Sequence, residues 1–308
     1  MVTAAAPKTP ARILCLGEAL VDLICERPLS SLLEADSFVP HFGGAVANVA
    51  VAASQAGAQV TLAGGVGEDE WGRWLEHRLL QEGVDTSLFE LVADRQTPVA
   101  FALVDERGEA RYQIYGEAIE TAVEALEERI EPALRSSKAL FISSNTLVGE
   151  DERTVTMKAR EVALDRGAHV VFDPNIRLHR WRSRASAAAS ANACVPQALL
   201  VRANRDEAEL LTGEADPERA ALALLKAGAR LVVITLGAGG AILRGELRAD
   251  ATGVPARVLS TIGAGDVFTG VLLARLAQSD FYPSVVAAAL PDAVKQATKA
   301  CERWGALD

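Results

Sequence analysis

The chain has 308 residues, half of them apolar, and its 31 basic and 41 acidic side chains give a formal net charge of −10. This length and apolar content suffice for one large α/β domain or two small ones, and they exclude a disordered chain and a mini-protein. The acidic balance offers no general attraction to a phosphate backbone or an anionic lipid surface, so neither nucleic acid nor a membrane is an expected partner.

Short apolar runs along the chain predict buried strands, and amphipathic stretches between them predict helices. The strands are expected over residues 12–16, 138–142, 169–172, 198–201 and 231–234. The helices are expected where apolar residues recur at helical spacing, over residues 45–56, 71–79, 119–134, 152–165, 206–211, 218–226, 266–277 and 283–303. This alternation predicts an α/β fold, a doubly wound, mostly parallel sheet flanked by helices.

Two stretches interrupt this rhythm, at about residues 20–42 and 98–116, where apolar and polar residues alternate with a period of two. Residues 105–108 (Asp-Glu-Arg-Gly) supply a turn within the second stretch. Both predict strands of a small antiparallel sheet inserted into a single domain of residues 1–308. Such a sheet would act as a lid over a ligand, or as an edge extension or dimerisation surface, and these roles are compatible.

The cysteines and the N-terminal residues indicate the compartment. The cysteines are scattered through mostly apolar runs without a C-x-x-C pair, so buried thiols are expected rather than a disulfide or a zinc site: Cys15, Cys25, Cys194 and Cys301. Residues 1–12 contain no apolar core of a signal peptide, and no segment has 18 uninterrupted apolar residues. The cytoplasm is therefore the expected location.

Polar residues directly follow three of the predicted strands. They occupy residues 173–177 (Asp-Pro-Asn-Ile-Arg), 202–207 (Arg-Ala-Asn-Arg-Asp-Glu) and 235–240 (Thr-Leu-Gly-Ala-Gly-Gly). Ligands of open α/β sheets bind beyond the carboxyl ends of the strands. The three strand ends therefore predict a polar cleft.

A glycine-rich turn precedes one of the predicted helices, at residues 261–266 (Thr-Ile-Gly-Ala-Gly-Asp). Gly263 and Gly265 let the backbone approach a ligand, and the free N–H groups of a helix start attract an anion such as phosphate. Asp266 would repel that anion unless its task is to take a proton from an attacking nucleophile. The alternative is an ordinary helix-capping aspartate.

Several further blocks occur in order along the chain: residues 17–22 (Gly-Glu-Ala-Leu-Val-Asp), 43–50 (Gly-Gly-Ala-Val-Ala-Asn-Val-Ala), 64–69 (Gly-Gly-Val-Gly-Glu-Asp), 83–85 (Gly-Val-Asp), 173–177 with Trp181, and Asn204-x-x-Glu207. With these blocks the chain resembles, from residue 17 to residue 305, the ribokinase-like (PfkB) carbohydrate kinases. The late signature of that family ends in Gly-Ala-Gly-Asp. It is most similar to fructokinases, because residues 17–22 and the 173–177 block with Trp181 occur together. The resemblance implies a ribokinase-like fold and a kinase that uses ATP and Mg²⁺.

The resemblance also implies which residues act on the phosphates and the nucleotide. Asp266 would be the general base for a sugar hydroxyl, and Gly263, Ala264 and Gly265 would present amides to the transferred phosphoryl group. Glu207 would orient water on Mg²⁺. The nucleotide-binding residues would be Asn204, Thr235, Gly237, Gly240, Gly263 and Gly265. Helix capping by Asn204 and a plain glycine-rich turn at residues 235–240 are the alternatives.

On the substrate side, the resemblance implies that the sugar is held by Asp22, Gly43, Gly44, Asn48, Arg177 and Asp266. Carboxylate and amide groups can pair with neighbouring hydroxyl groups of a sugar. The alternatives are an exposed strand-end acid at Asp22, a backbone-bonding helix residue at Asn48, and a solvated basic patch at Arg177.

Two departures from the family pattern concern K⁺ and the substrate. Ser260 stands where many relatives carry an aspartate of a monovalent-cation loop, which argues against activation by K⁺. Residues 112–117 (Tyr-Gln-Ile-Tyr-Gly-Glu) lack the arginine that many fructokinases and ketodeoxygluconate kinases place just after the aromatic residue. The identity of the sugar therefore stays open.

The absence of three motifs disfavours, in turn, a P-loop nucleotidase, a dinucleotide-binding oxidoreductase and a hydrolase with a nucleophile elbow. The chain has no Gly-x-x-x-x-Gly-Lys-Ser/Thr loop, no Gly-x-Gly-x-x-Gly after its first predicted strand, and no Gly-x-Ser-x-Gly elbow. Together with these absences, the resemblance implies an ATP-dependent sugar kinase, a fructokinase first, and a homodimer formed through the lid. A 2-keto-3-deoxygluconate kinase or a nucleoside kinase of the same family is the alternative, and a non-catalytic sugar or nucleotide sensor is the alternative from another class.

Overall fold

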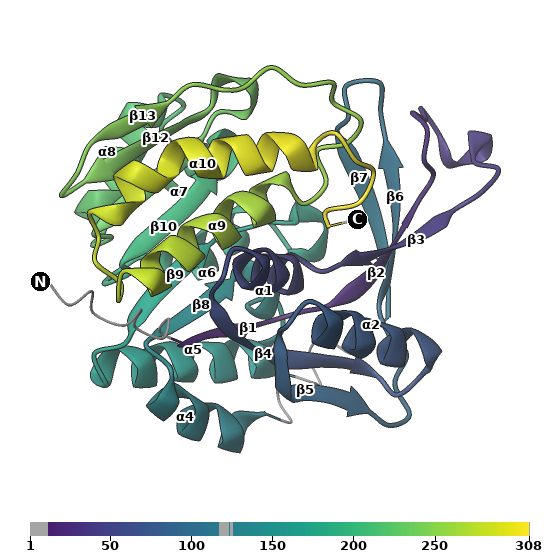
Figure 1. Ribbon diagram of the computed structural model, residues 1–308, viewed down its shortest axis with the longest axis horizontal. Helices are drawn as coiled ribbons and strands as arrows, with labels where there is room; N and C mark the ends of the chain where they lie inside the picture. Colours follow the sequence, from purple (N-terminus) through teal and green to yellow (C-terminus); the bar gives the residue numbers. More distant parts are fainter. Residues whose placement is uncertain (1–11, 117–122, 124–125, 308) are drawn as a thin grey trace, which may run out of the picture.

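Most of the chain folds around one large sheet. The structure, a computed structural model, describes residues 12–116, 123 and 126–307. Within them the sheet has nine strands in the order β13-β12-β11-β10-β9-β8-β1-β4-β5 (Figure 1). Their bounds are β1 (Arg12–Leu16), β4 (Gln59–Gly67), β5 (Asp85–Val92), β8 (Ala139–Ser143), β9 (His169–Asp173), β10 (Leu200–Asn204), β11 (Leu231–Thr235), β12 (Ala241–Gly245) and β13 (Ala249–Ala251). Neighbours from β11 to β5 pair in parallel, and β12 and β13 add antiparallel pairs at one edge.

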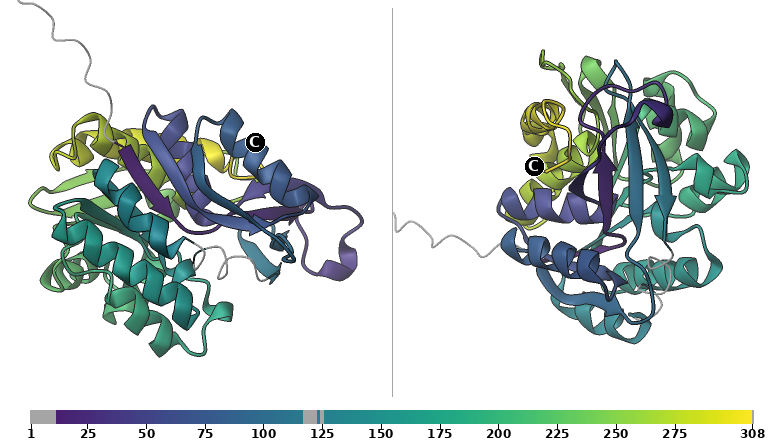
Figure 2. Two further views of the ribbon diagram at one scale, coloured as in Figure 1. Left: turned by 90° about the horizontal axis from the view of Figure 1, so that it is seen from below. Right: turned by 90° about the vertical axis from the view of Figure 1, so that its right-hand side faces the viewer.

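Helices cover both faces of this sheet (Figure 2). One face is covered by α1 (Ala45–Gln55), α2 (Glu70–Gln81), α9 (Ala264–Gln278) and α10 (Val285–Ala300). The other is covered by α4 (Glu127–Ser136), α5 (Glu150–Asp165), α6 (Arg184–Asn192), α7 (Arg205–Thr212) and α8 (Pro217–Lys226). Short 3₁₀ turns lie at η1 (Leu32–Glu34), η2 (Ser144–Thr146), η3 (Leu178–Arg180) and η4 (Gly237–Gly239). No helix in the described part of the chain is long and apolar enough to cross a membrane.

The central strand β1 shows why both faces need helices. Its side chains alternate between the two sides, as in any strand. Ile13 and Cys15 join a core cluster with residues of α1, α9 and α10, whereas Leu14 and Leu16 join a second cluster with residues of α5 and α8. A strand that is apolar on both faces is stable only when both are covered, so the expected doubly wound, mostly parallel sheet is confirmed.

The strand order reverses beside β1. Strands β4 and β5 lie on one side of β1, and β8 to β13 lie on the other. In open α/β sheets, ligands bind beyond the carboxyl ends of the strands at such a switch point. A ligand site is therefore expected among the residues that follow β1 and β8 to β11.

Most predicted elements agree with the observed ones, but some were missed. Strands β4, β5, β12 and β13 and helix α6 were not predicted. In β4 the reason is the run of glycines, which disfavour a strand on propensity alone. Gly64 is needed there, because a Cβ on it would lie 2.0 Å from the carbonyl oxygen of Gly17 on the neighbouring segment. Of the helix expected over residues 119–134, residues 119–122, 124 and 125 lie outside the described residues.

The two stretches with period-two alternation form a separate sheet, which we call the lid. It contains β2 (Leu20–Ile24), β3 (Val39–Gly43), β6 (Val99–Val104) and β7 (Ala110–Tyr115) in the order β3-β2-β6-β7. The pairs β2–β3 and β6–β7 are antiparallel, as expected, and a parallel pairing of β2 with β6 joins them. Figure 1 shows the lid beyond one end of the main sheet.

The lid packs against the turn that precedes α9. Its inward-facing Ile24, Ala102 and Val104 form a small apolar cluster with Ile262. The backbone N–H of Thr261 donates to the carbonyl of Gly108, in the β6–β7 turn, at 2.7 Å. The lid is therefore attached directly beside the predicted phosphate-binding turn.

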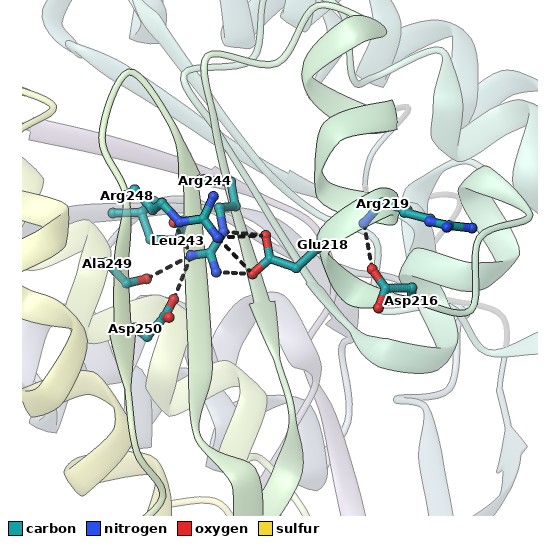
Figure 3. Close-up of polar contacts among 8 residues, drawn as sticks. All are labelled: Asp216, Glu218, Arg219, Leu243, Arg244, Arg248, Ala249 and Asp250. Carbon is teal, nitrogen blue, oxygen red and sulfur yellow. Dashed lines mark hydrogen bonds and ion pairs between the residues drawn. The ribbon is translucent and has the colours of Figure 1, made fainter.

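A polar cluster fastens the β12–β13 edge of the large sheet to α8 (Figure 3). Arg244 on β12 is 3% exposed and donates from Nε to Glu218 of α8 at 2.7 Å, and it also pairs with Asp250 of β13. Arg248 adds a longer contact to Glu218 at 3.3 Å. Because the partners of Arg244 reach solvent, this cluster holds the edge in place without resembling a ligand site.

Candidate active site

Asp266 lies at the centre of the polar residues predicted from the sequence. It is 5% exposed in the first turn of α9, and its two oxygens accept hydrogen bonds from two side-chain amides. Asn48 Nδ2, from α1, donates to Oδ2 at 2.9 Å, and Asn175 Nδ2, from the loop after β9, donates to Oδ1 at 3.0 Å. The helix begins with Gly263 as its N-cap, so Asp266 is not the capping residue.

Burial raises the pKa of Asp266 to about 7, although the hydrogen bond from Asn48 and the positive charges of Arg177 and Arg202 oppose the rise. The negative charge of Asp173 adds to it. A carboxyl group with a pKa near neutrality is well matched to taking a proton from a substrate. The environment of Asp266 therefore suits a general base.

The glycine turn of residues 263–265 leaves the start of α9 open. Gly263 has a φ of 72°, in the left-handed region, and a Cβ there would lie 2.1 Å from the Cβ of Ala306. A Cβ on Gly265 would lie 2.7 Å from Nη1 of Arg202. Since the N-cap is a glycine, no side chain caps the first-turn N–H groups. With Ala264 between the two glycines, this turn has the form of an anion site.

Behind the glycine turn lies a buried ion pair that the sequence reasoning missed. Arg202 donates from Nη1 to Asp173 Oδ2 at 3.2 Å and from Nη2 to Thr235 Oγ1 at 2.8 Å. Thr269, one turn after Asp266 on α9, donates to the same oxygen of Asp173 at 2.8 Å. The only sequence signal was that Arg202 and Asp173 each stand at the end of a predicted strand.

Asn204 and Glu207 form a capping box at the start of α7. Asn204 Oδ1 accepts from the N–H of Glu207 at 2.8 Å, and Glu207 Oε2 accepts from the N–H of Asn204 at 2.9 Å. The other oxygen, Oε1, accepts from the N–H of Ile176 at 3.0 Å. Helix capping, the alternative raised from the sequence, is therefore observed for this pair, and Glu207 also anchors the loop after β9.

The surroundings of Glu207 are still suited to a hydrated cation. Burial, and next the negative charge of Asp173, raise the pKa of Glu207. Asp173 Oδ1 is buried and has no hydrogen-bond partner among the described residues. In the same part of the chain no cluster of three or more His, Cys, Asp or Glu side chains could hold a metal by itself. Mg²⁺ commonly keeps several waters and takes one or two carboxylates, so these residues fit it when phosphates supply the remaining ligands.

The residues predicted for the nucleotide follow β11. Thr235 contacts Arg202 and so belongs to the same network as Asp173. Gly240 has a φ of 92°, and a Cβ there would lie 2.0 Å from the carbonyl of Ala251, whereas a Cβ on Gly237 would meet nothing within 4 Å. Gly240 is thus required by packing against the strand edge, and only Gly237 has open space beside it.

Residues predicted for the substrate meet where the lid joins the large sheet. Asp22 on β2 is 4% exposed, which excludes the exposed strand-end acid considered above. A Cβ on Gly43 would lie 2.4 Å from Asp22 Oδ2, and a Cβ on Gly44 would lie 2.6 Å from the Cα of Ala19. Gly43 therefore lets β3 pass close to Asp22, and Gly44 lets the start of α1 pass close to the backbone of Ala19.

Arg177 connects the loop after β9 with the lid. Its guanidinium lies 5.4 Å from the ring centre of Tyr112 on β7, a cation–π contact, and it is half-buried. Burial raises the pKa of Asp22 to about 7, and the charge of Arg177 is the main effect that opposes this rise. Arg177 therefore faces the acidic site rather than forming a solvated basic patch.

Glu18 is a further buried acid that the sequence reasoning did not select. It follows β1 at the switch point, is 3% exposed, and accepts from the N–H of Ala45 at 2.9 Å and from Asn145 Nδ2 at 2.7 Å. Its Oε2 has no hydrogen-bond partner within the described residues. Its place as the second residue of the block at residues 17–22 was the available signal.

Known proteins similar to this chain are carbohydrate kinases. The family model for pfkB family carbohydrate kinases matches residues 10–302. Probable fructokinase-4 of Arabidopsis thaliana is 30% identical over 266 residues, which are 86% of this chain and 82% of the relative. Fructokinase-1 of Oryza sativa subsp. japonica is 30% identical over 268 residues, 86% of this chain and 83% of the relative.

Solved structures share the fold over nearly the whole chain. Fructokinase with bound ATP from Xylella fastidiosa superposes with a TM-score of 0.82 at 27% identity, covering 96% of this chain and 93% of that one. Fructokinase from Vibrio cholerae O395, in its fructose-, ADP- and calcium-bound form, gives 0.81 at 27% identity, covering 97% and 96%. Aminoimidazole riboside kinase from Salmonella enterica, at 24% identity with a TM-score of 0.81 over 96% and 95%, shares the fold. Family match, homology and fold agree: this chain belongs to the PfkB family of carbohydrate kinases.

Proposed function

We propose that this protein is a fructokinase, which transfers the γ-phosphate of ATP to a hydroxyl group of fructose. The observation that carries the proposal is the placement of Asp266, a buried carboxyl held by two amides in the first turn of α9, next to the uncapped glycine turn. A sensor would need no base at this position, which disfavours the non-catalytic alternative. Homology to curated fructokinases supports the choice of sugar.

The reaction follows from the positions of these groups. Asp266 takes the proton of the sugar hydroxyl while that oxygen forms a bond to the γ-phosphorus and the bond to the β,γ-bridging oxygen breaks, leaving ADP. Charge that develops on the transferred group lies by the amides at the start of α9, where the helix dipole also favours it. The guanidinium of Arg202, which is paired with Asp173, lies behind Gly265 on that side.

Mg²⁺ would be held near Asp173 and Glu207 through water, and through the phosphates of the nucleotide. When bound, it would neutralise phosphate charge and help to orient the γ-phosphate. For K⁺ we propose no role, because Ser260 is fully buried and its hydroxyl accepts from the N–H of Ile262 at 3.1 Å. A neutral hydroxyl engaged in its own turn is a poor substitute for a carboxylate ligand.

Unpaired acceptors support a neutral sugar over a sugar acid. Asn48 Oδ1, Asn175 Oδ1 and Glu18 Oε2 are buried and lack partners in the described part of the structure. Such atoms are stabilised by O–H donors, which a polyhydroxy substrate brings in number. A sugar acid would add another acceptor beside Asp22 and Asp266, with Arg177 as the nearest compensating charge.

A substrate panel tests the proposal. The purified protein is incubated with ATP, Mg²⁺ and, in turn, fructose, other neutral ketoses and aldoses, 2-keto-3-deoxygluconate, common nucleosides and aminoimidazole riboside, and ADP release is followed. We expect the highest kcat/KM with fructose. A preference for the sugar acid or a nucleoside would replace the proposed substrate, and no ADP release with any compound would favour the sensor.

Gly43→Ala should weaken binding of the sugar specifically. The new methyl group would displace Asp22 from its position, and losing a hydrogen bond to a charged group corresponds to roughly a 10–100-fold rise in the sugar KM. The KM for ATP, measured in the same assays, serves as the internal control and should stay within about twofold, because Asp22 lies on the lid. An unchanged sugar KM would show that Asp22 does not contact the substrate.

We further propose that the protein is a homodimer joined through the outer face of the lid. The ring of Phe101 on β6 packs edge-on against Phe38 at 5.1 Å and Tyr115 at 5.9 Å, and Leu33 nearby in the chain is 96% exposed. Phe38 and Phe101 are half-buried and Tyr115 is 50% exposed, and apolar groups left partly exposed next to one another are typical of an interface. A second copy of the lid would cover them.

Sedimentation equilibrium tests this arrangement. The wild-type chain is expected at twice its monomer mass, and Phe101→Asp is expected to sediment as a monomer, because a carboxylate buried in an apolar interface is strongly unfavourable. Leu80→Asp, at a 55% exposed leucine of α2 outside the lid, should remain dimeric. A monomeric wild type, or a dimeric Phe101→Asp, would contradict the proposed interface.

A further inference from the structure

We infer that Asn175 is a positioning residue for Asp266, holding the carboxylate in place by a side-chain amide that a strained backbone aims at it. The inference rests on the proposed role of Asp266 as general base. Asn175 is 7% exposed and donates from Nδ2 to Asp266 Oδ1 at 3.0 Å, while Asn48 donates to the other oxygen. The carboxylate is therefore gripped from α1 on one side and from the loop after β9 on the other.

The backbone of Asn175 has an uncommon conformation for a residue with a side chain. Its φ is 42°, in the left-handed region that glycine adopts most readily. Strain of this kind persists only where the surrounding structure imposes it, and it concentrates at functional sites.

Hydrogen bonds fasten the loop on both sides of Asn175. The carbonyl of Pro174 accepts from the N–H of Ser144, which directly follows β8, at 3.1 Å. The N–H of Ile176 donates to Glu207 Oε1, at the start of α7, at 3.0 Å. With its neighbours fixed to two different elements, Asn175 is left to make the turn that aims its amide at α9.

The identity of the residue matches both demands. Glycine would adopt the backbone conformation freely but has no amide to donate. Aspartate tolerates the conformation about as well as asparagine, but its carboxylate would face that of Asp266. Asparagine alone among these combines tolerance of a positive φ with a neutral N–H donor.

The hydrogen bond from Asn175 favours the ionised form of Asp266, as does the one from Asn48. The charged groups that face Asp266 are Arg177 and Arg202, which also favour ionisation, and Asp173 and Asp22, which oppose it. Burial opposes it most strongly. Removing the amide of Asn175 should therefore raise the pKa of the base. As the pH is lowered, the variant should then lose its activity at a higher pH than the wild type does.

The test compares the pH dependence of kcat in the wild type, Asn175→Ala, Asn175→Gly and Asn175→Asp. In the Ala and Gly variants we expect the acid limb to move up by about one pH unit and kcat at pH 7 to fall about fivefold, with much of the loss recovered at pH 9. Asn175→Asp should move the limb further, because a second carboxylate would face the first. The KM for ATP should change little.

Stability separates this role from a structural one. Asn175→Gly relieves the strained φ, so its urea midpoint should be at least that of Asn175→Ala while both lose activity. Gln197→Gly is the matched control: Gln197 has a φ of 62° and is exposed in the connection between α6 and β10. It should gain stability with unchanged kinetics.

Measuring Asp266→Ala alongside the Asn175 variants distinguishes a failure of the proposed role of Asn175 from a failure of the proposed general base. If Asp266→Ala is inactive but the Asn175 variants keep the wild-type acid limb and kcat, Asn175 is a structural loop residue and the inference is wrong. If Asp266→Ala retains wild-type turnover, the proposed base itself is wrong, and the inference falls with it. If Asn175→Ala does not fold, Asn175→Gly, whose backbone accepts the conformation, decides the question.

Discussion

Asp266→Ala is expected to lower kcat by about 10²–10⁴-fold while the affinity for ATP stays nearly unchanged. The side chain is the only carboxylate in the first turn of α9, and it is held there by Asn48 and Asn175. Removing it takes away the proton acceptor for the attacking hydroxyl, but it leaves the amides of the glycine turn in place. Steady-state ADP release gives kcat, and isothermal titration calorimetry gives the affinity for ATP.

Asp151→Ala provides a control for that change. Asp151 also lies in the first turn of a helix, α5, but it is exposed. Its replacement removes the same charge from a comparable helix position, so kcat should stay at the wild-type value. Turnover by Asp266→Ala within about tenfold of the wild type would show that proton transfer to this carboxylate does not limit the reaction.

Arg202→Met is expected to have the largest effect on stability, a loss of about 3–5 kcal/mol in the free energy of unfolding. The pair of Arg202 and Asp173 has side chains only 8% and 1% exposed. Without the guanidinium, Asp173 would keep a buried charge with only Thr269 as hydrogen-bond donor among its described contacts. Urea denaturation measures the change.

The double variant shows whether an uncompensated charge is the cause. Arg202→Met combined with Asp173→Asn leaves no buried carboxylate at this position, so a large part of the lost stability should return. Arg248→Met, at a side chain that is 70% exposed and 3.3 Å from Glu218, should change stability by less than about 0.5 kcal/mol. A double variant as unstable as Arg202→Met alone would indicate lost packing instead of an unpaired charge.

Asp266 and Arg202 differ in how clearly the sequence indicates their roles. Asp266 stands in a motif, because a glycine turn, a helix start and an acid must be contiguous to form an anion site with a base beside it. Arg202 belongs to no such local pattern. Its hydrogen-bond partners, Asp173 of β9 and Thr235 of β11, are 29 and 33 positions away in the sequence. Thr269 of α9, which donates to the same Asp173, is 96 positions from that aspartate, and only packing brings these groups together.

Glu207 shows a different limit of sequence reasoning. The spacing Asn204-x-x-Glu207 fits both a helix capping box and a cation site, since both need an acid at the third position after the first residue. The structure shows the capping box and adds a bond to Ile176 that no spacing could have indicated. The same carboxylate thus supports the strained loop at Asn175.

The sequence by itself determined the features that local periodicity and contiguous motifs encode. These are the α/β class, the two inserted lid stretches, the family resemblance and the glycine turn with Asp266. Apolar periodicity reports which faces are buried, and a turn with a helix start is a local structure. The net charge of −10 also pointed to a small, local anion site, since the chain as a whole repels phosphate.

Only the tertiary structure decided how the site is assembled. It placed Asn175 on Asp266, Arg202 behind Gly265, and Arg177 against Tyr112 of the lid. Each of these contacts joins elements that are distant in the chain, and their geometry depends on strand order and on how closely backbones approach. Such contacts depend on the complete fold, because the sequence neighbours of a side chain do not indicate which residue it will contact across the sheet.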